Sequence, residues 1–247
     1  MIRRVGLLAV LSCLACESAT TPAFTPSKPD ASGVPDAASS RRDASGMRDA
    51  ATPAPLRVQL FTRTQGFRHE SIEPAVRALT ALHGMRVQRT EDAAELARAL
   101  ADTDVVVFLM TTGDVLSDAE QGSLEAYVRK GGGFVGVHSA ADTEYAWPFY
   151  GLLNGAWFAS HPVVQRARLS VQHELEPPLA FLPSDWERED EWYNFQANPR
   201  MDSAVRVLVT LDETSYQGGT MGADHPIVWC RELDQGRAFY TGLGHTE

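Results

Sequence analysis

The amino-acid sequence predicts an α/β domain in which a doubly wound, mostly parallel sheet carries helices on both faces. Between residues 56 and 137, short apolar runs alternate with segments of helical periodicity. Residues 104–110 (DVVVFLM) form a continuous apolar run, as a strand buried on both faces of a parallel sheet does. Alternation of this kind favours parallel neighbouring strands that are connected by helices.

Each element in the first half of the domain has its own signal. Residues 56–63 alternate and then turn apolar, as a strand does. Ser71 is placed to cap a helix whose apolar residues recur at helical spacing. Ser117 and Glu120 form an S-x-x-E capping box for a later helix, which glycines 131–133 end. Strands are accordingly expected at 56–63, 85–88, 104–110 and 134–137, with helices after Ser71, at 93–100 and after Ser117.

The second half of the domain has a different character. It holds all five tryptophans, and long loops separate its apolar runs; loops carry function more often than core does. Strands are expected at 167–172 and 205–211, and a hairpin at 227–231 and 237–240. The chain shows no internal repeat, so residues 56–247 are expected to form one domain.

The first sixteen residues resemble a bacterial lipoprotein signal. Two arginines precede an apolar stretch that is too short to span a bilayer. Either Cys13 or Cys16 would be lipidated, and Cys16 is favoured because it leaves the longer apolar stretch. Residues 17–55 are rich in Ala, Ser, Thr, Pro and Asp, which predicts a disordered tether. The protein is therefore expected in the cell envelope, lipid-anchored to a membrane or secreted.

Charge and cysteine content exclude some classes of partner and fold. The formal net charge is −10, which argues against nucleic acid as a partner, because phosphate binding needs a basic patch. Cys230 is the only cysteine beyond the leader, so a disulfide within the domain is excluded. It lies in an apolar run and is expected to be a small buried residue.

The stretch 131–145 is the main candidate for a ligand site, because its short apolar strand ends at His138. In an open α/β sheet, ligands collect in the crevice at the carboxyl ends of the strands. Histidine changes charge near neutral pH and is the commonest metal ligand. Five of the seven histidines stand at loop starts: His69, His138, His161, His225 and His245. His161 and His225 each precede a proline, which favours loop shaping over chemistry for these two.

Carboxylates accompany these histidines in two places. Asp142 and Glu144 follow His138 in the same loop and offer acid–base groups; the alternative is that they cap a helix N-terminus. Asp190, Glu191 and Tyr193 form a second polar and aromatic cluster. The alternative for this second cluster is a solvated loop with buried aromatic rings.

A transition-metal site is a further alternative for two or three of the histidines together with Asp142 or Glu144. No HExxH motif or other short ligand spacing indicates one, so all ligands would have to converge from distant loops. The sequence identifies no cofactor. It also lacks a dinucleotide fingerprint, so any redox step would belong to a separate partner enzyme.

Several long motifs together resemble one known family. They are GFRHESI (66–72), TTGDVLSDAE (111–120), GGGFVGVHSAADTEYAWPFYGLLNGAWFASHP (131–162), DEWYNF (190–195) and MGADHPIVWC with GRAFYTGLGHTE (221–247). In this order they resemble the trehalose-utilisation (ThuA-like) family of the class I glutamine amidotransferase-like superfamily, from residue 57 to 247. The resemblance implies a flavodoxin-like fold and a role in carbohydrate metabolism, with a disaccharide or keto-sugar as the small-molecule partner.

The resemblance to amidotransferases also marks what is absent. Their nucleophilic cysteine follows a Gly-x pair at a strand-to-helix elbow, whereas Gly136-Val137 is followed here by His138. Glutaminase activity is therefore not expected. Their catalytic His-x-Glu pair corresponds to His245-Thr246-Glu247. Family members usually continue for another segment, so the chain is expected to be either truncated or without the last helical layer.

These observations lead to one hypothesis and two alternatives. In the hypothesis, His138 and His245 carry out acid–base chemistry on a sugar, while Asp142 and Glu247 orient them or share protons. The residues expected to contact the substrate are Arg68, His69, Glu144, Trp147, His161 and Tyr193. One alternative is a surface module that binds sugar without catalysis, and the other is a degenerate, weakly folded product. The sequence leaves open whether the protein is an enzyme.

Overall fold

The computed structural model of the protein describes residues 54–172 and 182–246. Outside these ranges lie the expected leader with Cys13 and Cys16, all but the end of the expected tether, and Glu247. Within the described ranges, no helix is both long and apolar enough to cross a bilayer.

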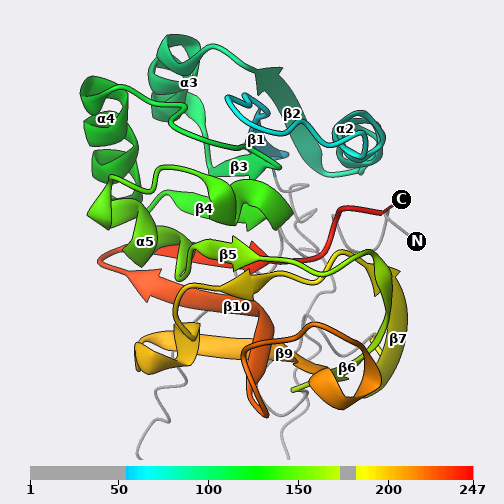
Figure 1. Ribbon diagram of the computed structural model, residues 1–247. Helices are drawn as coiled ribbons and strands as arrows, with labels where there is room; N and C mark the ends of the chain where they lie inside the picture. The colour runs from blue at the N-terminus through cyan, green and yellow to red at the C-terminus, as the bar shows by residue number, and fades with distance from the viewer. Residues whose placement is uncertain (1–53, 173–181, 247) are drawn as a thin grey trace, which may run out of the picture. The chain divides into compact units, whose positions relative to one another are not determined.

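Among the described residues, nine strands form one sheet in the order β2-β1-β3-β4-β11-β10-β9-β6-β7 (Figure 1). Its first five strands are parallel to one another. They are β2 (Met85–Thr90), β1 (Leu56–Phe61), β3 (Val105–Leu109), β4 (Gly133–Val137) and β11 (Gly236–Thr241). The order 2-1-3-4 with β11 as fifth strand is the flavodoxin-like order, so the predicted fold class is confirmed.

The second half of the chain extends this sheet with antiparallel strands. They are β10 (His225–Leu233), β9 (Val205–Asp212), β6 (Gln165–Val171) and β7 (Asp185–Asp190). The predicted hairpin is confirmed, since β10 and β11 pair antiparallel around a turn in which Asp234 has a φ of +55°. A small second sheet pairs β5 (Phe158–Ser160) with β8 (Asn194–Phe195).

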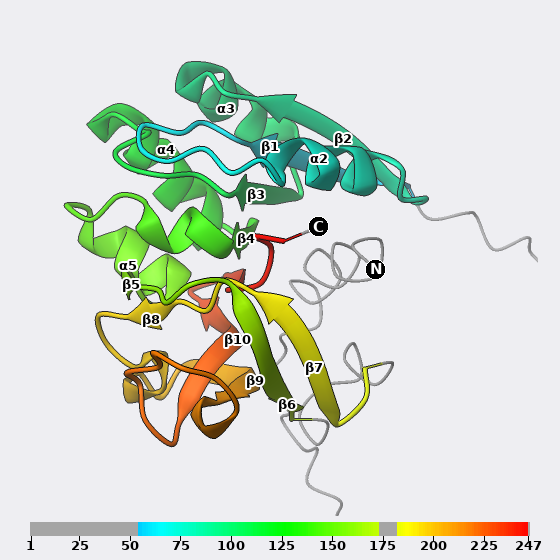
Figure 2. The ribbon, with the colours of Figure 1, turned by 45° about the vertical axis from the view of Figure 1, so that its right-hand side comes forward.

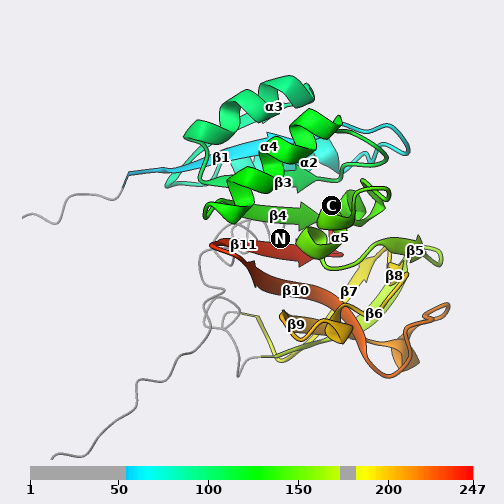
Figure 3. The ribbon, with the colours of Figure 1, turned by 90° about the vertical axis from the view of Figure 1, so that its left-hand side faces the viewer.

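Helices cover both faces of the parallel half, as Figures 1 and 3 show. The α-helices are α2 (Ile72–Thr80), α3 (Ala93–Ala99), α4 (Asp118–Arg129) and α5 (Pro148–Asn154), and the 3₁₀ helices are η1 (Leu100–Asp102), η2 (His138–Asp142), η5 (Pro199–Met201) and η6 (Glu213–Ser215). Helix α2 packs into one apolar core, and α3, α4 and α5 pack into the other. In β3, Val105 and Val107 face the first core while Val106 and Phe108 face the second. This alternation explains why the strand is apolar throughout.

The expected helix caps have different outcomes. Glu120 Oε2 accepts the backbone N–H of Ser117 at 2.7 Å, so the predicted capping box is present. Ser71 stands at the N-cap of α2 but makes no capping bond, and that prediction was wrong. Its backbone is already helical, whereas a capping residue is normally extended. Its hydroxyl instead donates to the Met110 sulfur at 3.2 Å.

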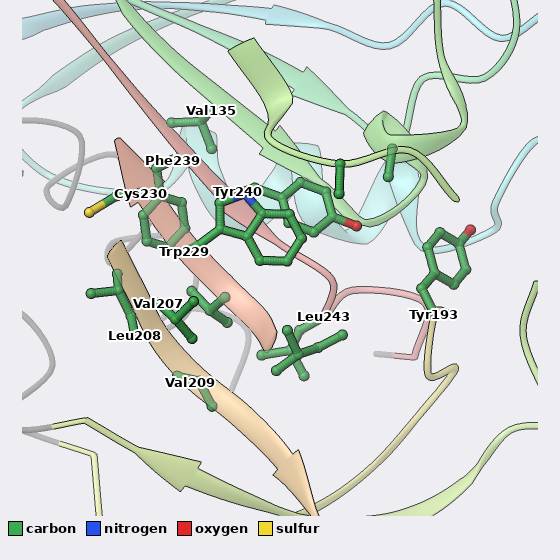
Figure 4. Packing of buried hydrophobic residues seen from close by; sticks show 14 of the residues in the cluster. Val135, Tyr193, Val207, Leu208, Val209, Trp229, Cys230, Phe239, Tyr240 and Leu243 are labelled. Carbon is green, nitrogen blue, oxygen red and sulfur yellow. The ribbon is translucent and has the colours of Figure 1, made fainter. Parts of the chain in front are cut away.

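Aromatic side chains fill the junction between the parallel and antiparallel halves. The rings of Trp229 in β10 and Tyr240 in β11 stack with centroids 4.3 Å apart (Figure 4). The Trp229 indole also donates to the carbonyl of Asn154 at 2.9 Å, which satisfies its buried N–H. Cys230, the residue after Trp229 in β10, is buried, as expected of a small apolar residue.

Candidate functional site

Three histidines and one glutamate meet at the carboxyl edge of the parallel strands. We call His69, His138, Glu191 and His245 the His–Glu cluster, because one side-chain nitrogen or oxygen of each lies within 4.8 Å of those of the others. His69 follows β1, His138 follows β4 and His245 follows β11, so three parallel strands deliver the imidazoles. Glu191 follows β7, the edge strand of the antiparallel half. The cluster therefore joins both halves of the sheet.

His138 occupies a strained elbow between β4 and the 3₁₀ helix η2. Its φ is +49°, a left-handed conformation that non-glycine residues adopt at a cost of about 1–2 kcal/mol. Nδ1 lies 2.8 Å from the carbonyl oxygen of Gly242, which only accepts, so Nδ1 carries the proton. In the neutral ring Nε2 therefore carries the lone pair, and in the protonated ring it points a second N–H at Glu191. It is buried, makes no hydrogen bond, and lies 3.3 Å from Glu191 Oε2.

Glu191 is the common neighbour of the surrounding rings. Its Oε2 lies 3.3 Å from both His138 Nε2 and His245 Nδ1, and its Oε1 lies 3.0 Å from His161 Nδ1. Burial alone would raise the pKa of the Glu191 carboxyl, but the surrounding histidines, His138 above all, lower it by more. The net pKa lies below the usual value, so Glu191 carries its negative charge at neutral pH.

His69 completes the cluster from the loop after β1. Its ring stands edge-on to those of His138 and His245, with centroids 4.9 and 5.1 Å apart. Burial, together with these two neighbouring imidazoles, lowers the pKa of His69 to about 3. The ring is neutral at pH 7. Its Nδ1 lies 3.3 Å from the hydroxyl of Ser139, which leaves Nε2 for the cluster.

Tyr193 and His161 form the outer side of the cluster. The Tyr193 ring lies against His138, with centroids 4.2 Å apart, and His161 stacks on Tyr193 at 6.0 Å. Burial raises the pKa of the Tyr193 hydroxyl, which stays protonated. The side chains of His161 and His245 are 42% and 26% exposed, against 9% for Glu191. Solvent therefore reaches the cluster past these two rings.

Asp190 fixes the last part of the chain beside Glu191. Its buried carboxylate accepts the backbone N–H groups of Gly244 and Thr246, each at 3.1 Å, and pairs with Arg188 at 2.9 Å. Figure 2 shows the last residues (red) turning across the sheet edge between the ends of β4 and β7. These bonds position His245, which lies between Gly244 and Thr246. Asp190 is thus a positioning residue.

Two residues expected to act with His138 have partners of their own. Asp142 accepts a hydrogen bond from the Tyr145 hydroxyl at 2.6 Å. Glu144 is buried, and its Oε1 accepts the backbone N–H groups of Val115 and Leu116 at 2.7 and 2.8 Å. This geometry gives Glu144 the task of holding the loop after β3. Neither carboxylate belongs to the His–Glu cluster.

Two residues expected to contact substrate also have other surroundings. Arg68 pairs with Glu91 at 2.9 Å and donates to the carbonyl of Thr62. Trp147 is 9% exposed and packs with Tyr150 in the core beneath α3, α4 and α5. His69, His161 and Tyr193 are the expected contact residues that the structure brings together with His138 and His245. Glu191 was not among the predicted catalytic or substrate-contact residues. The sequence placed it only in a polar and aromatic cluster, and the DEWYNF motif was the signal that could have identified it.

Three imidazoles around one carboxylate can do two kinds of chemistry. Free lone pairs accept protons from a bound molecule, and a protonated ring returns them. The same nitrogens and oxygen are also the donor set of a transition-metal ion. Both uses require an ordered arrangement, which the backbone bonds of Gly242, Gly244 and Thr246 supply.

Comparisons with known proteins agree with this fold. A ThuA-like protein from Bacteroides uniformis has a similar structure, with a TM-score of 0.66 and 26% identity over 81% of this chain and 86% of that one. A ThuA-like protein from Parabacteroides merdae gives 0.64 and 20% identity over 78% and 81%. A β-galactosidase from Bacillus circulans shares the fold over 77% of this chain but 29% of its own, with a TM-score of 0.51 and 11% identity.

The family comparison covers the described domain almost completely. No curated protein matches the chain. The model of the ThuA family, described as trehalose utilisation, matches residues 57–247, which is more than half of the sequence. The chain therefore belongs to the ThuA (trehalose utilisation) family.

Proposed function

We propose that this domain is an enzyme that acts on a carbohydrate and that histidines of the His–Glu cluster carry out acid–base chemistry there. The observation that carries the proposal is the pair of buried ring nitrogens, His138 Nε2 and His245 Nδ1, which face Glu191 without hydrogen bonds. Buried polar atoms normally have partners, and exceptions call for an explanation such as catalysis.

The surroundings of the cluster suit a small polar molecule with apolar ring faces. Sugar hydroxyls pair with carboxylates and imidazoles, and aromatic rings cover the apolar faces of sugars. Phe67 is 66% exposed and its ring lies 4.9 Å from that of His69. The family description, trehalose utilisation, favours a disaccharide or a keto-sugar derived from one.

The roles follow from position. A sugar against the cluster would give a proton to one of the inner bases, and the partly exposed His161 would exchange it with water. Glutaminase chemistry is not part of the proposal, because His138 stands at the elbow and Cys230 is buried within β10. The leader-like first sixteen residues lead us to place this activity in the cell envelope.

Turnover of sugars tests the proposal. The protein is incubated with trehalose and with its 3-keto derivative, and the products are followed by chromatography. Wild type should convert at least one of them, and His138→Ala or Glu191→Gln should lower turnover by about 10²–10⁴-fold, the usual contribution of general acid–base catalysis. The exposed His83, changed to alanine, is the matched control and should keep full turnover.

Two results would contradict the proposal. Full turnover by His138→Ala and Glu191→Gln would remove the cluster from the reaction. Saturable sugar binding with no conversion would identify the surface sugar-binding module instead.

A further inference from the structure

We propose that His69, His138, Glu191 and His245 bind one divalent transition-metal ion, with zinc as the reference ion. As a reaction centre, this site rests on the proposed function above. As a binding site, it stands on the geometry of the four side chains alone.

The spacing of the donor atoms fits a metal-centred arrangement. Zinc binds imidazole nitrogen and carboxylate oxygen at about 2.0–2.2 Å, so two ligands of a tetrahedral site lie about 3.4 Å apart. His138 Nε2 and His245 Nδ1 each lie 3.3 Å from Glu191 Oε2. All four donor atoms lie within 4.8 Å of one another, which modest side-chain rotation closes around one ion. Three nitrogens disfavour calcium and magnesium, which take oxygen ligands.

The unpaired nitrogens supply an independent reason for a cation. His138 is fully buried, its Nδ1 donates to Gly242, and its Nε2 has no hydrogen-bond partner and offers a lone pair in the neutral ring. His245 Nδ1 is also buried without a hydrogen-bond partner. In the neutral rings these lone pairs face a charged carboxylate oxygen at 3.3 Å, and a bound cation removes the repulsion. A proton relieves one such pair at a time, whereas one metal ion engages all four donors.

The outer contacts are those that metal-ligating histidines usually have. Such a histidine typically gives its second nitrogen to a carbonyl, a carboxylate or water, and this contact fixes the tautomer and the ring orientation. His138 does so through the carbonyl of Gly242 at 2.8 Å. The second nitrogen of His69 faces the Ser139 hydroxyl at 3.3 Å. Glu191 Oε1, the oxygen away from the cluster, is held by His161 at 3.0 Å.

A metal at this position would give the histidines different roles. The nitrogens of His69, His138 and His245 then serve as ligands, and the ion polarises a sugar oxygen as a Lewis acid. His161 is not in the ligand set and stays at the exposed side of the cluster.

Metal binding can be measured without any sugar. The protein is purified without chelator for elemental analysis, then stripped with chelator, dialysed, and titrated with Zn²⁺ and Co²⁺ by calorimetry and visible absorption. We expect one ion per chain. His69→Ala and Glu191→Ala should weaken binding at least about hundredfold, and Ser139→Ala about tenfold, as losses of ligands and of outer contacts do. His161→Ala removes the outer contact to Glu191 Oε1 and should weaken binding about tenfold as well. The exposed His83, changed to alanine, is the control and should keep wild-type affinity.

Folding of each variant is checked by circular dichroism and by a melt in chelator. Added Zn²⁺ should raise the melting temperature of wild type but not of Glu191→Ala, because an ion that binds only the folded state stabilises it. All variants share the leader cysteines, so binding there cancels in the comparison. Less than about one-tenth of an ion per wild-type chain, or wild-type affinity in His69→Ala and Glu191→Ala, would overturn the metal site.

The two proposals fail separately. Stoichiometric metal without conversion of any sugar would leave the metal site standing and remove the proposed reaction. Full sugar turnover by wild type that binds less than about one-tenth of a Zn²⁺ or Co²⁺ ion per chain in the titration would leave the reaction standing and remove the metal site.

Discussion

Two buried histidines of this domain stand near glutamates, and they are paired in opposite ways. His225 at the start of β10 uses both ring nitrogens: Nε2 donates to the carbonyl of Tyr193 at 2.9 Å, and Nδ1 accepts from the Tyr216 hydroxyl at 3.1 Å. His138 at the end of β4 uses only Nδ1, and its Nε2 faces Glu191 without a hydrogen bond. Both rings are fully buried.

The difference separates a structural histidine from a functional one. His225 has the partners that a buried polar group needs, and its bond to the Tyr193 carbonyl holds the segment that leads away from Glu191. His138 leaves a buried nitrogen unpaired and has a strained φ of +49°. Unpaired groups and strain of this kind lower stability and cluster at functional sites. Burial alone does not distinguish the two; the state of the second nitrogen does.

Stability of the metal-free protein gives the most direct test of this contrast. His225→Ala should lower the free energy of unfolding by about 1 kcal/mol more than His138→Ala, because it breaks one more hydrogen bond, which contributes about 1 kcal/mol. Both changes remove a buried ring of the same size, so the cavity contribution largely cancels. The measurement is urea unfolding in the presence of chelator, with equal m-values required. Equal losses would show that the Nε2 atom of His138 has a partner after all.

The strands and helices of the parallel half could be predicted from the sequence, because their signals are local. Residues 104–110 are apolar throughout since they face two cores, and the strand 134–137 ends at His138 as expected. The antiparallel half gives weaker signals. Strand β7 (DWERED) is a polar edge strand with little apolar alternation, and it was not expected.

Reliance on local signals also explains why the sequence indicated the wrong carboxylates as neighbours of His138. Asp142 and Glu144 were chosen because they follow His138 closely in sequence. Glu144, however, has a φ of +55° and turns to the backbone after β3. The carboxylate of the cluster comes from the end of β7, 53 residues further along than His138. Only the antiparallel extension of the sheet places the Glu191 carboxylate next to His138. No local sequence pattern indicates that the two residues lie close together.

A glycine in the last segment gives a second test, which reports on the position of His245. Gly244 has a φ of +136°, and an added Cβ would lie 3.3 Å from side-chain atoms of Met110 and Val137. Gly244→Ala should therefore cost about 1–3 kcal/mol in backbone strain and displace His245 beside it. The matched control is Gly222→Ala, where φ is +81° and the space is open. The control should lose stability alone, whereas Gly244→Ala should also weaken zinc binding and turnover. If both variants lost stability but kept wild-type zinc binding and turnover, the position of His245 would not matter for function.

The smallest expected effect on stability concerns Tyr193, which contacts both histidines of the comparison. Its carbonyl accepts from His225, and its ring lies 4.2 Å from that of His138. Tyr193→Phe keeps both contacts and removes only the hydroxyl, so the free energy of unfolding should change by no more than about 1 kcal/mol. If the hydroxyl contacts the sugar, the KM for the converted sugar should rise about fivefold, the worth of one hydrogen bond, with kcat unchanged. An unchanged KM would restrict Tyr193 to packing against His138, and weakened zinc binding would instead make its hydroxyl part of the metal surroundings.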